Sequence, residues 1–306
     1  MRKIVSRRPP AAWEVHAALL AAQTGFALFP TLGKLVLASM PPLPLSALRV
    51  SCAALLLESV RRLSRGESLA PGDHKRVFVY GLLGISLNQV LFILGLSLTT
   101  AINTTILTAT IPVFTLAVAV LLKRETLTLP LAAGVALAGA GALVLVNVRN
   151  FDWHSRYVQG DLLLLGNAVA YSLYLVLSRP ILAHYSVMTI VSRIFVYGAP
   201  PILLFTAPAL LRFSPSAVTP LSWMSFAGVV VLCTVAPYAL NSWALARTGA
   251  SRVALYVFIQ PLIASALAVL VLKERLTIRT LAAGALILAG LAVSVSRPRL
   301  AAEEVS

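Results

Sequence analysis

Long apolar stretches, each close to the length of one membrane span, follow one another along the chain with short polar segments between them. A bilayer core about 30 Å thick is crossed by roughly 20 helical residues. Only 11% of the residues are charged, against about 25% in a typical soluble domain. We therefore expect an all-α integral membrane protein with ten transmembrane helices, at 14–37, 45–60, 76–97, 102–122, 128–147, 160–179, 188–209, 221–244, 252–272 and 278–296.

One phrase of the sequence occurs twice. It reads "PVFTLAVAVLLKRETLT" at 112–128 and "PLIASALAVLVLKERLT" at 261–277, with eight of seventeen positions identical. The copies fall at spans four to five and nine to ten, so the repeat unit is five helices. Because five is odd, the second copy enters the membrane upside down, which is the inverted repeat of many secondary transporters. The alternative is a duplication that only enlarged a helix bundle.

This repeat divides the chain into two halves. The predicted organisation is a first five-helix repeat at 1–147, an outer linker at 148–159, a second repeat at 160–296 and a cytoplasmic tail at 297–306. The connections are short, so we expect one membrane domain without a soluble appendage.

The net charge of +15 comes from 25 Lys and Arg against 10 Asp and Glu. With the amino terminus placed inside, sixteen of these cations fall on the inner side, six on the outer side and three within spans. This bias predicts that both termini are cytoplasmic. The cations lie in the gaps between apolar runs rather than in one patch, so we expect no nucleic-acid partner. The two cysteines are placed neither for a disulfide nor for a metal.

The repeated phrase belongs to a longer pattern of proline, an apolar run, Glu-x-Leu-Thr and a glycine-rich helix. It reads "PVFTLAVAVLLKRETLTLPLAAGVALAGAGALVLV" and "PLIASALAVLVLKERLTIRTLAAGALILAGLAVSV". This pattern resembles the EamA type of the drug/metabolite transporter superfamily, and "GDLLLLGNAVAYSLYLVLSR" at 160–179 is similar to the opening helix of its second repeat. The resemblance covers nearly the whole chain. The first span departs from the family, which commonly has Trp-Gly where this chain has Gln23, Thr24 and Gly25.

The resemblance implies two inverted five-helix halves around a central cavity. Spans one, three, four, six, eight and nine would line that cavity, and spans five and ten would support the ends. The resemblance also implies an exporter of amino acids, nucleosides, metabolites or drugs, usually located in the bacterial inner membrane.

Polar side chains inside the spans are the candidate substrate-binding residues. Such groups are expensive in lipid and tend to face a cavity or another helix. The alternative for each residue is an interhelical hydrogen bond. The candidates are Gln23, Thr24, Asn88, Gln89, Asn103, Thr108, Asn167, Tyr171, Tyr174, Tyr238, Asn241, Trp243, Tyr256 and Gln260.

Three cations fall within spans, namely Lys34, Arg49 and Arg193. For Lys34 and Arg49 the simpler interpretation is that the side chain reaches back to the headgroups. The alternative is that one of the three contacts an anionic group of the substrate.

Pro112 and Pro261 lie at matching places in the halves and are predicted hinges, because a proline inside a span removes a backbone hydrogen bond. Glu125 and Glu274 are interpreted as first-turn caps of the helix that follows each of them. The glycines of spans five and ten predict close helix packing: Gly134, Gly139, Gly141, Gly284 and Gly290.

These features favour a secondary transporter that exports a small amphipathic solute by alternating access. All ten carboxylates are expected near span ends, in loops or in the tail, so we favour facilitated diffusion or exchange over carboxylate-based proton coupling. No catalytic motif, cofactor or metal ligand set is apparent, which disfavours an intramembrane enzyme. A non-transporting membrane scaffold or a lipid scramblase remains the alternative. The expected partners are membrane lipids and a small-molecule substrate, with the protein a monomer or weak homodimer.

Overall fold

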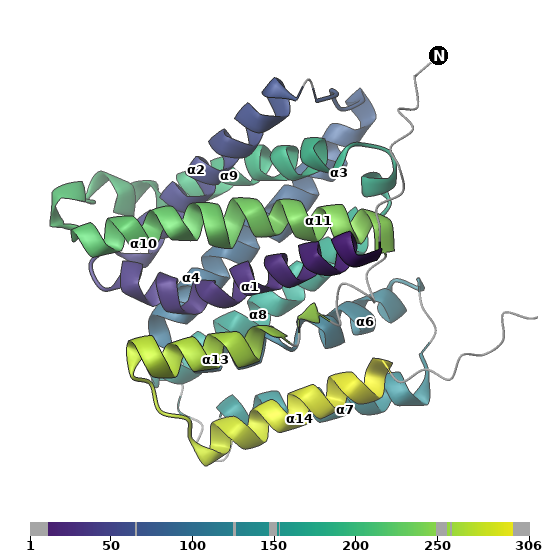
Figure 1. The fold of residues 1–306 in the computed structure, drawn as a ribbon, viewed down its shortest axis with the longest axis vertical. Helices are drawn as coiled ribbons and strands as arrows, with labels where there is room; N and C mark the ends of the chain where they lie inside the picture. The colour runs from purple at the N-terminus through teal and green to yellow at the C-terminus, as the bar shows by residue number, and fades with distance from the viewer. Residues whose placement is uncertain are drawn as a thin grey trace, which may run out of the picture.

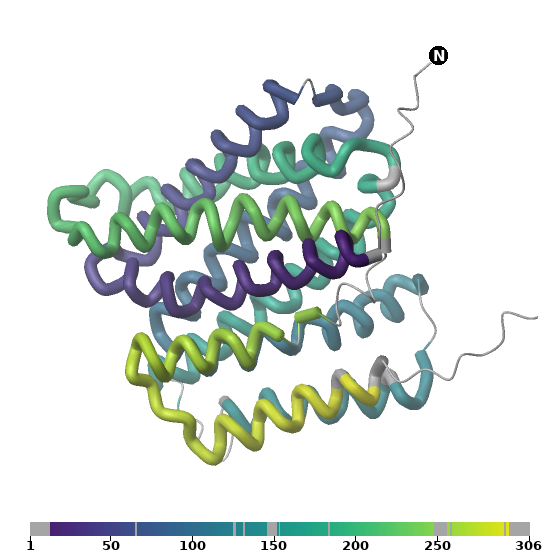
Figure 2. The backbone as a smooth tube through the Cα atoms, viewed as in Figure 1, coloured from purple at the N-terminus to yellow at the C-terminus, as the bar shows by residue number. Residues whose placement is uncertain are grey.

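The computed structural model describes residues 12–64, 66–124, 127–146, 152, 154–248, 256–257 and 259–295. These residues form ten helical spans that lie side by side (Figures 1 and 2), so the all-α fold predicted from the sequence is confirmed. The spans are α1 (Ala12–Leu37), α2 (Pro42–Leu63), α3 to α4 (His74–Leu98), α5 to α6 (Ala101–Leu121), α7 (Leu129–Val146), α8 (Arg156–Ser178), α9 (Val187–Leu211), α10 to α11 (Pro220–Thr248), α13 (Ile259–Leu272) and α14 (Ile278–Val295).

Two of the spans contain a short π-helical segment at matching positions. In the third span, η2 (Leu82–Leu87) separates α3 (His74–Gly81) from α4 (Asn88–Leu98). In the eighth, η6 (Val231–Val235) separates α10 (Pro220–Val230) from α11 (Ala236–Thr248). The two segments begin 149 residues apart, which is also the offset between Pro112 and Pro261. The repeat therefore extends to a backbone irregularity of a kind that often marks functional sites.

The two expected hinge prolines lie in the first turn of a helical segment rather than in its interior. α5 (Ala101–Thr108) ends just before α6 (Ile111–Leu121), and Pro112 is the second residue of α6. Pro261 is the third residue of α13. Proline is tolerated there because the first N–H groups of a helix have no intrahelical partner. Pro112 thus stands at a break in the fourth span, while a hinge function for either proline stays a prediction.

The packing of the helices is symmetric with respect to an exchange of the two halves. α2 packs along α9 and α7 along α14, each a pair of equivalent spans. α1 packs against α10, α11 and α13, and its equivalent α8 packs against α4, α5 and α6. Because the main contacts run between the halves, the two repeats interlock instead of forming separate domains.

Both described ends of the chain lie at one end of the bundle. Figure 1 shows the Ala12 end of α1 and the Val295 end of α14 on the same side as the end of α6. We refer to this side as the terminal face. The opposite face holds the ends of α1, α4 and α13 at Leu37, Leu98 and Leu272. This arrangement follows from an even number of crossings.

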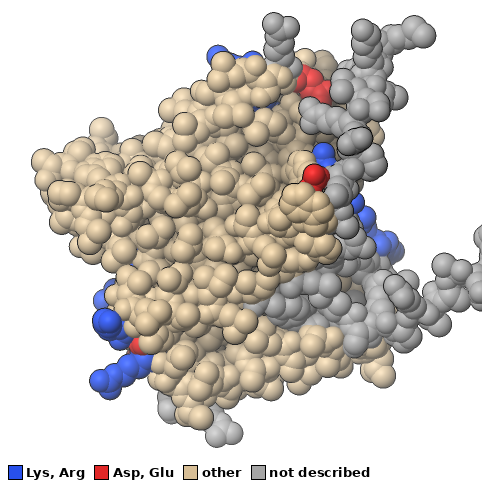
Figure 3. Space-filling view, viewed as in Figure 1, with Lys and Arg blue, Asp and Glu red and all other residues tan. Residues whose placement is uncertain are grey.

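The surface of the bundle suits a lipid environment. In the described part of the chain, seven helical stretches are long and apolar enough to cross a membrane, and three shorter apolar helices lie at 132–145, 259–272 and 278–290. Large apolar side chains such as Leu129 and Leu204 point outward, 84% and 80% exposed. On the face shown in Figure 3 the charged side chains gather towards the ends of the helices, with an uncharged band between them.

Candidate substrate-binding cavity

A central cavity lies between the two halves and contains about 980 Å³ of space free of atoms, part of it open to the outside. Its lining comes from the six spans that the family resemblance implied, and from α2 through Arg49. The lining residues are Gln23, Phe26, Ala27, Phe29, Pro30, Arg49, Asn88, Gln89, Phe92, Thr105, Thr108, Ile111, Pro112, Thr115, Asn167, Tyr171, Leu175, Tyr238, Asn241, Leu245, Val257 and Gln260.

Helical spacing explains why these residues meet. On α1 the lining includes Gln23, Phe26, Ala27 and Pro30, which recur every three or four residues. Residues with this spacing lie on one face of an α-helix. The same spacing joins Asn167, Tyr171 and Leu175 on α8. Each span therefore presents a single stripe to the cavity.

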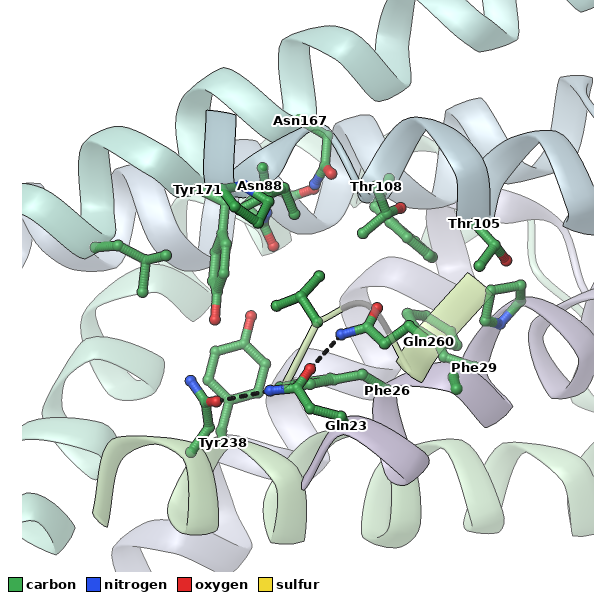
Figure 4. A pocket seen from close by; sticks show the side chains of 18 of the residues that line it. Gln23, Phe26, Phe29, Asn88, Thr105, Thr108, Asn167, Tyr171, Tyr238 and Gln260 are labelled. Carbon is green, nitrogen blue, oxygen red and sulfur yellow. Dashed lines mark hydrogen bonds between the residues drawn. The ribbon is translucent and has the colours of Figure 1, made fainter. Parts of the chain in front are cut away.

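Three amide side chains connect the first, eighth and ninth spans at one wall of the cavity. The Gln23 Nε2 atom donates to Asn241 Oδ1 at 3.0 Å, and Gln260 Nε2 donates to Gln23 Oε1 at 2.5 Å (Figure 4). All three residues are buried. An amide side chain has two donor hydrogens and an acceptor oxygen, so the trio retains unused polar capacity beside the cavity.

Two tyrosines form the neighbouring wall. Their hydroxyl groups point into the same space in Figure 4, and the rings of Tyr171 and Tyr238 meet edge to face with centroids 6.4 Å apart. The Tyr238 hydroxyl accepts a hydrogen bond from Gln89 Nε2 at 2.9 Å. Nearby, Asn167 Nδ2 donates to the Asn88 carbonyl at 2.8 Å, joining α8 to α4. The wall is thus both aromatic and able to form hydrogen bonds.

Arg49 is 1% exposed and points inward from the second turn of α2. Its Nε atom donates to Thr234 Oγ1 at 2.7 Å and its Nη1 atom donates to Gln89 Oε1 at 2.5 Å. The guanidinium carbon lies 3.7 Å from the centre of the Phe29 ring, a cation–π contact. The interpretation that Arg49 reaches back to the headgroups is therefore wrong.

Nine of the fourteen candidate polar residues line this cavity: Gln23, Asn88, Gln89, Thr108, Asn167, Tyr171, Tyr238, Asn241 and Gln260. These nine side chains meet in one cavity because amides and hydroxyls are costly against lipid and therefore face the interior of the bundle.

The other five candidates are not among the lining residues. Tyr174 packs against Gly84 instead, where a Cβ atom would lie 2.5 Å from the tyrosine Cγ. Asn103 lies in the first turn of α5 and its backbone N–H donates to the Thr100 cap at 3.0 Å. Tyr174 is therefore packed against the third span, and the backbone N–H of Asn103 is bonded within the cap of α5.

Trp243, Tyr256 and Thr24 also lie away from the cavity lining. The Arg247 guanidinium lies over the Trp243 ring, 4.2 Å from its centre. The Tyr256 hydroxyl contacts His16 Nδ1 near the terminal face. Thr24 follows Gln23 on α1, is half-buried and has another orientation around the helix.

Of the three cations within spans, only Arg49 lines the cavity. Lys34 Nζ donates to the Thr99 carbonyl at 2.5 Å near the opposite face. The Nη1 atom of Arg193 lies 3.8 Å from a carboxylate oxygen of Glu58. Glu58 belongs to the part of α2 near the terminal face. Contact between a substrate in this cavity and Lys34 or Arg193 is therefore not supported.

Glu274 caps a different helix from the one expected. Its two carboxylate oxygens accept hydrogen bonds from the backbone N–H groups of Ala101 at 2.8 Å and Ile102 at 3.0 Å. These are the first residues of α5, in the other half of the chain, so the prediction of a cap for the following helix is wrong. The matching prediction for Glu125 lies outside the described residues.

Sequence reasoning missed the phenylalanines of the lining, because it selected only aromatic side chains that carry a polar group, such as Tyr171 and Tyr238. Phe26 lies one turn from Gln23, while Phe29 and Phe92 stack with ring centroids 4.7 Å apart. An apolar ring in a span suits lipid and cavity equally well. The available signal was spacing, since Phe26 falls three residues after Gln23 on the same helical face.

The acidic side chains of the described residues lie outside the cavity lining, and no group of three or more His, Cys, Asp or Glu in that part of the chain could hold a metal ion. Asp161 is 2% exposed and accepts a hydrogen bond from Thr99 Oγ1 at 2.7 Å. It lies near the start of α8, as expected for a carboxylate at a span end.

Comparison with known proteins decides the family. The model of the EamA-like transporter family matches this chain twice, at residues 13–147 and 158–296. The chain belongs to the EamA-like transporter family. It is therefore a multi-pass membrane transporter of the drug/metabolite transporter superfamily, and not an enzyme.

Relatives of this EamA-like transporter are also described as transporters. An uncharacterized transporter of Archaeoglobus fulgidus is 28% identical over 274 residues, covering 86% of this chain and 91% of that protein. A second from the same organism is 24% identical over 258 residues, covering 84% and 90%. A solved structure described only as the crystal structure of a protein has a TM-score of 0.63 at 21% identity, covering 92% of this chain and 96% of that one. That likeness shows the shared fold.

Proposed function

We propose that this EamA-like protein is a secondary transporter that exports a small amphipathic solute, such as an amino acid, a nucleoside or a drug-like molecule. The supporting observation is one cavity between two interlocked halves, lined by phenylalanine and tyrosine rings together with amide side chains. Aromatic rings suit the apolar body of such a solute, and a few fixed polar groups suit its hydrogen-bonding atoms.

Alternating access is the proposed mechanism. Two pairs of equivalent spans pack against each other, α2 with α9 and α7 with α14. A further pair, the third and eighth spans, carries π-helical segments at the offset of the repeat. In an inverted repeat, each half can adopt the conformation of the other, which opens the shared site to the other side of the membrane. The break before Pro112 lies at the cavity and is a natural position for such a change.

The proposed location is the bacterial inner membrane, as the family resemblance implies, and the distribution of Lys and Arg supports placing both termini in the cytoplasm. The proposed energetics are exchange or facilitated diffusion, since the cavity lining consists of neutral side chains and Arg49. We propose a monomer or weak homodimer, surrounded by lipid, that needs no cofactor.

Counterflow in reconstituted vesicles tests this function. Vesicles preloaded with a metabolite mixture should accumulate a labelled member of that mixture, and uptake should saturate. The scaffold alternative predicts no uptake above that of empty vesicles. The scramblase alternative predicts unsaturable movement of labelled lipid without solute counterflow, and either of these results would reject the proposal.

A further inference from the structure

The cavity contains one charged side chain that lacks an acidic partner within the described part of the chain. Arg49 is almost completely buried, and the described carboxylates lie outside the cavity lining. Its hydrogen bonds go to two neutral groups, the Thr234 hydroxyl and the Gln89 amide. A buried cation is stabilised mainly by an opposite charge. The positive charge at this site is therefore not neutralised by the described protein groups around it.

Part of the hydrogen-bonding capacity of Arg49 is also unused. A guanidinium group carries five N–H donors in a planar fork. Among the described residues, one acceptor meets Nε and one meets Nη1, while Nη2 donates to none. Because Arg49 is among the residues that line the cavity, a ligand there can reach the free edge of the fork. Such a fork matches the two oxygens of a carboxylate.

The equivalent arginine of the second half provides an internal comparison. Arg193 lies in the second turn of α9, as Arg49 lies in the second turn of α2, the equivalent span. Arg193 faces Glu58, at 3.8 Å, and Glu58 also binds Arg61 and Arg62 at 2.7 and 2.8 Å. One arginine of the pair is thus met by an acid of the protein, whereas the other faces the cavity.

The surroundings of Arg49 indicate what the rest of the ligand is like. Phe29 lies under the guanidinium and stacks on Phe92, so an aromatic surface adjoins the charge. The hydroxyl of Tyr238 lies in the same hydrogen-bonded group, through Gln89. A ligand with one anionic end and a compact apolar body would place each part against a matching wall.

We infer that the cavity binds a monovalent organic carboxylate, whose anionic group pairs with Arg49 and whose apolar body lies against the phenylalanine and tyrosine rings. This inference rests on the proposed transport function and names the substrate class. A single cation matches a single negative charge, so neutral and cationic analogues of the same shape should bind more weakly.

A panel of probes that differ in charge tests the inference on the wild-type protein. Thermal unfolding of the purified transporter would be followed with acetate, 4-methylpentanoate and 3-phenylpropionate, each beside its amide, and with 2-phenylethylamine. We expect at least one carboxylate to raise the unfolding temperature in a saturable manner, and its amide and the amine to have a much smaller effect. Equal stabilisation by the amide, or no stabilisation by any carboxylate, would overturn the inference.

Variants then connect the effect to Arg49. In Arg49→Gln we expect the stabilisation by the carboxylate and its counterflow to fall about tenfold or more, as for loss of a charge-assisted pair. Arg49→Lys keeps the charge but not the fork, and should retain part of the binding. Arg193→Gln and Lys34→Gln remove cations that lie outside the cavity and should retain carboxylate binding. Unchanged binding in both Arg49 variants would contradict the assignment.

These experiments distinguish failure of the anion site from failure of the proposed transport function. Saturable counterflow of a neutral or cationic solute, without binding of carboxylates, would support the transporter and reject the anion site. If Arg49→Gln does not fold, the charge panel on the wild-type protein still decides the inference.

Discussion

Gln89 and Tyr238 occupy equivalent positions in the two halves and are hydrogen-bonded to each other. They are 149 residues apart, the same offset as Pro112 and Pro261, and Gln89 Nε2 donates to the Tyr238 hydroxyl at 2.9 Å. Each follows the π-helical segment of its own span. A contact between equivalent positions lies on the axis that relates the halves. Any exchange of conformations between the halves must therefore preserve or rebuild this bond.

We expect Gln89→Leu to destabilise the protein more than Tyr238→Phe does. Tyr238→Phe leaves one buried amide donor without its acceptor, which costs about 1–3 kcal/mol. Gln89→Leu removes the same bond and also the acceptor of Arg49 Nη1, at 2.5 Å. Thermal or denaturant unfolding of the purified variants in detergent measures the difference.

The double variant distinguishes a direct bond from two separate effects. Residues in one hydrogen-bond network couple by about 0.5–3 kcal/mol, so the double variant should lose less stability than the two single losses added. The exposed Tyr157→Phe is the matched control for loss of a tyrosine hydroxyl and should leave the unfolding temperature unchanged. Strict additivity would show that the contact carries no energy of its own.

Glu274 joins the halves at the opposite face, and we expect Glu274→Ala to destabilise α5. The carboxylate accepts from the N–H groups of Ala101 and Ile102. Loss of a cap of this kind costs about 1 kcal/mol. Hydrogen exchange at 101–104 should accelerate, and counterflow should change because α5 lines the cavity.

The neighbouring Arg275→Ala gives the control for this prediction. Arg275 lies in the same connection and is exposed. It should affect neither exchange in α5 nor transport. Equal effects of the two variants would mean that the connection as a whole, rather than the cap, determines the behaviour of α5.

Two glycines on α7 allow a paired test of the contact with α14. A Cβ atom on Gly141 would lie 2.8 Å from the Ala283 carbonyl oxygen, whereas a Cβ on Gly139 would meet nothing within 4 Å. Overpacking typically costs about 1–3 kcal/mol, so Gly141→Ala should lower the unfolding temperature. Gly139→Ala should not, because alanine favours helix over glycine. If the two variants behave alike, α7 and α14 are not packed as closely as the structure shows.

The ten spans and most polar cavity residues could be predicted because lipid restricts the chain strongly. A backbone in hydrocarbon must satisfy its own hydrogen bonds, so long apolar runs become helices. An amide such as Gln23 or Asn167 is costly against lipid and turns inward. These two constraints act on each span separately and leave a signal in the sequence.

The features that were missed depend on neighbours from elsewhere in the chain. Tyr174 turns away from the cavity because Gly84 leaves space for its ring. Glu274 caps α5 because the interlocking of the halves brings that helix end to it. The depth of Arg49 in its span did not indicate whether it pointed to lipid or to Thr234. Such choices are made by tertiary packing rather than by local pattern.

Orientation in the membrane is the last prediction. In a background with Cys52 and Cys233 replaced by alanine, Ser64→Cys and Ser214→Cys place single exposed thiols after α2 and between α9 and α10. These positions lie at the terminal face and the opposite face, so a membrane-impermeant maleimide should reach them from opposite sides. By the positive-inside rule, Ser64→Cys should be labelled only from the cytoplasm. Reversed labelling would place both termini outside the cell and contradict the proposed orientation in the membrane. Labelling of both positions from one side would contradict the placement of Ser64 and Ser214 at opposite faces of the bundle.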